Sequence, residues 1–75
     1  MTPYRDWDHD SGIRAYEIGE ACIDVEFKDG HVYRYSYLRP GRAEVEHMAG
    51  LARSGEGLNG YINRVVRKRY ERKLR

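Results

Sequence analysis

The chain has little aliphatic material, one cysteine and no long apolar run. Leu, Ile, Val and Phe together number 14 of the 75 residues, and the longest aliphatic run is the pair Val65-Val66. Such runs are too short for a signal peptide or a membrane-spanning helix. Cys22 is the only cysteine, which excludes an internal disulfide and fits a reducing compartment. We therefore expect a soluble, cytoplasmic protein with no membrane partner.

The aromatic residues supply the apolar area that the aliphatic residues do not. A share of aliphatic residues this low indicates disorder only when the net charge is high, and here the net charge is +2. Seven Tyr, one Phe and one Trp can bury a large area in a small domain. We expect one folded domain at residues 11–75, preceded by a tail at residues 1–10 that shows no periodicity.

The spacing of apolar residues predicts an α+β fold. Apolar and polar residues alternate in the first half of the chain, as in strands with one buried face, whereas the second half repeats at i, i+3, i+4 and i+7, as in amphipathic helices. The pattern predicts strands at 13–18, 22–27 and 31–38, and helices at 42–54 and 58–70. The expected architecture is a three-stranded antiparallel meander packed against two C-terminal helices, in the order β-β-β-α-α.

The register of the second hairpin can be predicted from its side chains. A two-residue turn at Asp29-Gly30 would place Arg34 opposite Val25, on the apolar face. A three-residue loop at 28–30, with its glycine in the left-handed conformation, pairs Val25 with Tyr33 and sets Asp24 beside Arg34. A slip of one residue reverses every side chain of a strand. We therefore expect the three-residue loop, with Asp24 and Arg34 as a surface pair.

The tyrosines of the third strand can be interpreted in two ways, as core residues or as a binding surface. Tyr33 and Tyr35 are either core residues or an exposed stacking surface for bases, as in RNA-binding sheets. The register sets them opposite Val25 and Ile23, on the face that the helices cover, which favours the core. Tyr37, near the strand end, is the better candidate for stacking on a base.

Positive charge is concentrated at the C-terminal end. Residues 64–75 hold seven basic side chains and one acidic side chain, whereas residues 1–63 have a net charge of −4. A cluster of cations repels itself unless a partner neutralises it, and phosphates do so with release of counterions. We therefore predict a basic C-terminal helix that binds nucleic acid. The residues expected to contact phosphates are Arg64, Arg67, Lys68, Arg72 and Lys73.

Two other readings of the same features stay open. A helix, a glycine-rich turn and a basic second helix is also the order of a helix-turn-helix DNA reader, for which Asn59 and Asn63 are the candidate base contacts. The basic end could instead dock on an acidic protein partner.

The chain also resembles the KTSC domain, a short module named after the C-terminus of some lysyl-tRNA synthetases. The resemblance rests on Val25-Glu26-Phe27-Lys28-Asp29-Gly30-His31-Val32-Tyr33-Arg34-Tyr35, on Ser11-Gly12-Ile13, on Gly60-Tyr61-Ile62-Asn63 and on Val66-Arg67-Lys68-Arg69-Tyr70. It covers residues 11–70, and it implies a small α+β module and raises RNA above DNA as the expected partner.

No arrangement typical of catalysis or of metal binding is visible in the sequence. The stretch from Asp6 to Glu17 is similar to an EF-hand calcium loop, but the required glycine is displaced by one position and the flanking helices are missing. Cys22 and the three histidines do not lie at ligand spacing. We expect no enzyme activity, no metal and no cofactor.

The first prediction concerns this acidic stretch. Thermal unfolding in excess calcium and in excess chelator should give the same midpoint, because a ligand that binds only the native state would raise it. A calcium-dependent increase of several degrees would contradict the prediction.

Overall fold

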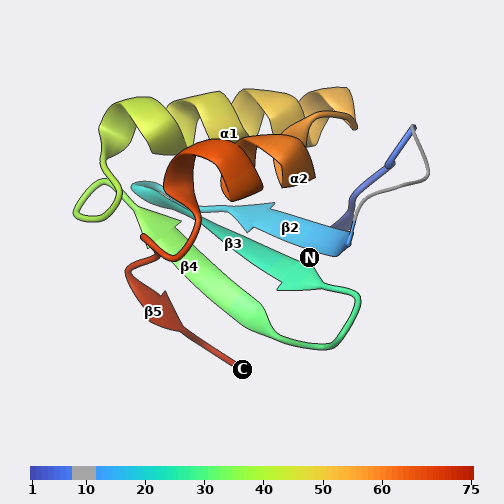
Figure 1. Cartoon of the computed structure of the whole chain (residues 1–75), viewed down its shortest axis with the longest axis horizontal. Helices are drawn as coiled ribbons and strands as arrows, with labels where there is room; N and C mark the ends of the chain where they lie inside the picture. The colour runs from blue at the N-terminus through green and yellow to red at the C-terminus, as the bar shows by residue number, and fades with distance from the viewer. Residues whose placement is uncertain (8–11) are drawn as a thin grey trace.

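The molecule has two layers, an antiparallel sheet and a pair of helices that cover one of its faces (Figure 1). The computed structural model describes residues 1–7 and 12–75. The elements are β1 (Thr2–Pro3), β2 (Ile13–Ile18), β3 (Cys22–Phe27), β4 (Val32–Ser36), α1 (Arg42–Ser54), α2 (Leu58–Tyr61), the π-helical turn η1 (Ile62–Val66) and β5 (Arg72–Lys73). The strands lie side by side in their order along the chain.

The central hairpin confirms the predicted register. Val25 pairs with Tyr33 and Asp24 with Arg34, and the loop between the strands consists of the three residues 28–30. Gly30 has a φ of 94°, a left-handed conformation that glycine adopts at no steric cost. Its N–H donates to the carbonyl oxygen of Phe27 at 2.9 Å and closes the turn.

The core lies between the sheet and the helices. Ile23, Val25 and Tyr35 from the two central strands are at most 2% exposed. The first helix has the predicted bounds, and its predicted apolar positions are all buried. The core residues contributed by the helical layer are Val45, Met48, Ala52, Leu58, Ile62 and Val66. The covered face of the sheet is therefore the one that the alternation predicted.

The sheet has five strands rather than the three predicted. One additional strand comes from the segment expected to be a tail, because Thr2–Pro3 pair with β2. Tyr4 is 7% exposed, and its hydroxyl accepts a hydrogen bond from the backbone N–H of Leu58 at 3.2 Å. That bond satisfies one of the backbone donors left free at the start of α2. Residues 8–10 of the expected tail lie outside the described residues.

The predicted basic C-terminal helix is shorter than expected. The helix ends at Val66 instead of continuing to Tyr70, and its last residues form a π-helical turn. Ile62 and Val66, four residues apart on one face of the helix, are buried against the core. Val65, which the 3.6-residue period placed on the apolar stripe, is 42% exposed.

A tight turn at Arg67 reverses the chain after the helix. Arg67 has φ 44° and ψ −114°, and the N–H of Arg69 donates to the carbonyl oxygen of Val66 at 2.7 Å. These values match the first central position of a type II′ turn, which glycine normally occupies. The chain then returns to the sheet, where Arg72 and Lys73 pair with β4 as the fifth strand.

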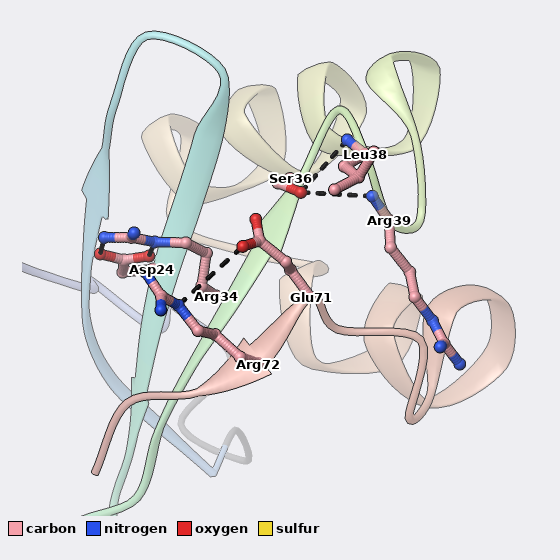
Figure 2. A network of polar contacts seen from close by, with 7 residues as sticks. All are labelled: Asp24, Arg34, Ser36, Leu38, Arg39, Glu71 and Arg72. Carbon is pink, nitrogen blue, oxygen red and sulfur yellow. Dashed lines mark hydrogen bonds and ion pairs between the residues drawn. The ribbon is translucent and has the colours of Figure 1, made fainter.

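The outer face of the sheet holds a charged network (Figure 2). Arg34 donates two hydrogen bonds to the carboxylate of Asp24, at 2.8 and 3.0 Å. The side chain of Asp24 is only 12% exposed, so the predicted pair exists but is not a surface pair. The hydrogen bond and the charge of Asp24 raise the pKa of Arg34. Beside it, Arg72 lies 3.9 Å from the Glu71 carboxylate.

The burial of Asp24 leads to a stability prediction. Arg34→Ala should lower the free energy of unfolding by about 1–3 kcal/mol, because it leaves a buried acceptor without its partner. Tyr35→Ala should cost about 3 kcal/mol or more, as other large-to-small core changes do. Denaturant unfolding measures both.

Arg42→Ala is the matched control, because Arg42 forms an exposed i,i+4 pair with Glu46. It should leave the unfolding midpoint nearly unchanged. Equal effects of Arg34→Ala and Arg42→Ala would contradict the structural role of the Asp24–Arg34 pair.

The conformation of Arg67 leads to a third prediction. Arg67→Gly should stabilise the fold by about 0.5–2 kcal/mol, because the relief of a strained positive φ exceeds the entropy cost of glycine. Arg67→Ala removes the same side chain but keeps the strain, so it should give no gain. Lys68→Gly, at a residue without a positive φ, should destabilise. A destabilising Arg67→Gly, measured by denaturant unfolding, would exclude the type II′ turn.

Candidate nucleic-acid interface

Four aromatic rings gather where the C-terminal segment meets β4. The ring centroids of Tyr33 and Tyr70 are 4.5 Å apart with an angle of 39° between the ring planes. Phe27 lies edge-on to Tyr33 at 5.8 Å, and Tyr35 lies edge-on to Tyr70 at 6.3 Å. Tyr35 is buried, and its burial, with a smaller effect of the other two tyrosines, raises its pKa. Phe27, Tyr33 and Tyr70 are part-buried and keep some exposed ring surface.

The cluster borders a cavity of about 280 Å³ between β4 and the end of the second helix. The cavity is lined by Phe27, Tyr33, Tyr35, Ile62, Asn63, Arg67, Lys68 and Tyr70. Half of its lining residues are aromatic, and its polar side chains are one amide, two cations and three tyrosines. None of its lining residues is acidic, so its local charge is positive.

Of the six residues that the sequence singled out, the structure brings three together around this cluster. Arg67 and Lys68 line the cavity, and the Lys73 ammonium nitrogen lies 6.0 Å from the centroid of the Tyr33 ring. Lys73 reaches this face because it pairs with Tyr33, and paired residues of neighbouring strands point to the same side. Within the described residues, none of these three cations has a carboxylate within 4 Å.

The other two predicted cations lie further away. Arg72 pairs with Arg34, so it points to the outer face of the sheet, where it neighbours Glu71 (Figure 2). Arg64 is an exposed residue of the π-helical turn and follows Asn63, which lines the cavity. Its guanidinium lies over the backbone at Gly60. The continuous basic helix that was expected to expose Arg64, Arg67 and Lys68 does not exist, because the helix ends before Arg67.

Tyr37 lies apart from the cluster and contacts α1. Its hydroxyl donates a hydrogen bond to Glu46 at 3.0 Å, which raises the pKa of Tyr37. The guanidinium carbon of Arg42 lies 5.5 Å from the centroid of the Tyr37 ring. Hydrogen bonds from Arg42 and Tyr37 lower the pKa of Glu46. The Tyr37 side chain is therefore held against α1 by Glu46 and Arg42. It lies away from the cations beside which it was expected to stack on a base.

Sequence reasoning missed Tyr70 as a candidate site residue, and it named Asn63 only for the helix-turn-helix reading. Both were assigned to a continuous helix, with Tyr70 at the edge of its apolar stripe. The contact between Tyr33 and Tyr70 depends on the turn at Arg67 and on the pairing of β5 with β4. Residues 70–74 read Tyr-Glu-Arg-Lys-Leu, and the three consecutive charged residues give no alternation that would indicate a strand.

The structure describes part of the EF-hand match. Glu17 lies within β2, so the chain there is a strand and not a helix. Residues 8–11 lie outside the described residues. They include two acidic positions of the calcium loop, Asp8 and Asp10, and the position of its required glycine, Ser11. Among residues 1–7 and 12–75, no three His, Cys, Asp or Glu side chains are grouped for a metal ion.

No helix in this part of the chain is long and apolar enough to cross a membrane.

Comparison with known proteins adds no further assignment: no protein-family model, no curated protein and no solved structure matches this chain.

Proposed function

We propose that this protein is a small, non-catalytic module that binds nucleic acid through the phosphates of the strand, with RNA as a better candidate than DNA. The observation that carries the proposal is the group of cations around the Tyr33–Tyr70 contact. Arg67 and Lys68 line one cavity, Lys73 lies over the adjacent ring, and none of them has a carboxylate partner among the described residues.

Three other arginines of the chain contrast with this group of cations. Arg34, Arg42 and Arg75 each have a carboxylate partner at 2.8–3.1 Å. The cations around the aromatic cluster do not, although the chain has 12 acidic residues that could neutralise them. Cations that are left together without an anion favour a polyanionic partner, because binding releases the counterions condensed on its phosphates.

The preference for RNA rests on two further arguments. Aromatic rings beside cations are typical of proteins that recognise unpaired bases, which RNA presents more often than DNA. The resemblance to the KTSC domain points the same way, and we propose it as the family of this chain. The predicted contacts become Arg64, Arg67, Lys68 and Lys73, while Arg72 and Tyr37 take no direct part.

The fourth prediction tests phosphate binding by a salt titration. Three to four phosphate contacts predict that log affinity falls with log salt concentration with a slope of about −2 to −4. Replacing Arg64, Arg67 and Lys68 together with Gln should weaken binding of all sequences alike and flatten the slope by about two to three units. Fluorescence anisotropy with labelled single-stranded RNA, duplex RNA and duplex DNA measures the slopes.

The matched control replaces Arg14, Arg42 and Arg53 with Gln. It removes the same net charge from exposed positions of β2 and α1 that do not line the cavity. The control should leave the slope nearly unchanged. Equal effects of the two triple variants would reduce the interaction to net charge and contradict a defined surface.

The rival functions are outcomes of the same titration. Tightest binding to duplex DNA would favour the helix-turn-helix reading, with Asn59 and Asn63 as base contacts. Binding weaker than about 100 µM to every nucleic acid at 50 mM salt, the weak end of non-specific binding, would overturn the proposal. An acidic protein partner would then be the better candidate.

A further inference from the structure

The cavity beside the Tyr33–Tyr70 contact has walls of two kinds. On the sheet side, Phe27 and Tyr33 present part-exposed aromatic surface. On the helix side, Asn63, Arg67 and Lys68 are exposed polar residues within five positions of one another along the chain. An aromatic wall facing an amide and two cations is suited to a ligand that is flat and apolar at one end and anionic at the other.

The size of the cavity limits this ligand. A volume of about 280 Å³ lies at the lower end of the range of small-molecule sites, which is about 300–1,000 Å³. It can take one nucleobase, but it is too small for a folded domain or a duplex. A base that enters it must be unpaired, because the faces of a paired base are covered by its neighbours in the helix.

The backbone around the cavity is unusual at the position of one cation. A π-helical turn ends at Val66, and Arg67 follows in a conformation that glycine normally adopts. Non-glycine residues in such conformations, and π turns, occur preferentially at functional sites. An arginine at this turn lowers the stability of the fold. Despite this cost, Arg67 provides a guanidinium at the rim of the cavity.

We propose that this cavity is a nucleotide subsite, which holds one unpaired base of a single-stranded RNA together with its phosphate. The base stacks on the exposed aromatic surface of Tyr33 and Tyr70. The Asn63 amide, which has both donor and acceptor groups, hydrogen-bonds to the edge of the base. Arg67 and Lys68 bind the adjacent phosphate. The inference rests on the proposed function and adds to it the recognition of a base.

The fifth prediction compares a single-stranded oligoribonucleotide of 12 residues with a 12-residue strand of the same phosphates that lacks bases. The wild-type protein should bind the first about 5- to 150-fold more tightly, the effect that aromatic stacking of one base typically has. Tyr70→Leu keeps an apolar side chain at this part-buried position but removes the ring, so it should lose most of this preference while binding the baseless strand normally. Asn63→Ala should reduce the preference as well.

Two matched controls separate recognition from folding. Tyr61→Leu changes another part-buried tyrosine that stacks on His47 and does not line the cavity. Asn59→Ala changes the asparagine one helical turn before Asn63. Both variants should keep the preference for the strand with bases. Thermal unfolding of all four variants shows whether any loss of binding reflects a loss of the folded state.

A second measurement does not depend on a variant. Adenosine and uridine monophosphate, added to the ¹⁵N-labelled protein, should shift the Asn63 side-chain amide and the backbone amides of Arg67 and Lys68. Inorganic phosphate should shift only the latter two.

The outcomes distinguish the subsite from the proposed function. Equal affinity for the two strands, with no effect of Tyr70→Leu and no shift of the Asn63 amide by the nucleotides, would overturn the subsite and leave phosphate binding intact. Absence of binding to either strand would overturn both. Equal binding of duplex and single-stranded RNA would also contradict the subsite, because a duplex offers no free base.

Discussion

The turn at Arg67 is the constraint on which the candidate site depends. The second helix ends in a π-helical turn at Val66, and the reversal that follows returns the chain to the sheet as β5 (Figure 1). This path carries Tyr70 onto Tyr33 and brings Lys73 over the same ring. A helix that continued through Tyr70 would carry these groups away from the sheet and would leave the aromatic residues of β4 without their cations.

Strand alternation then divides the basic residues between two environments. Lys73 pairs with Tyr33 on the helix-covered face, whereas Arg72 pairs with Arg34 on the outer face. The outer face is organised by Asp24 and Arg34, whose double hydrogen bond is part-buried (Figure 2). Charges on that face are paired with each other. Those near the aromatic cluster have no such partner among the described residues, and this difference is the reason that we propose a polyanionic partner for the cluster.

The aromatic residues serve the core and the candidate site together. Tyr35 is 2% exposed and supplies part of the apolar area that the chain lacks in Leu, Ile and Val. Tyr33, two residues earlier on the same face, is only part-buried and borders the cavity. The question whether these tyrosines are core residues or a stacking surface therefore has a different answer for each. A residue near the edge of the covered face can contribute to both.

The central hairpin, its register and the first helix could be predicted from the sequence. Those features depend on local patterns: the alternation around Val25, the left-handed Gly30, and the apolar spacing that ends at Gly55. The edge strands, the end of the second helix and the grouping of Arg67, Lys68 and Lys73 depend on tertiary contacts and could not be predicted. A two-residue strand has too short a pattern to recognise, and it forms because a neighbouring strand offers free backbone groups. The helix period likewise continued past Val66 in the sequence, but packing against the sheet and a turn at a non-glycine residue ended it.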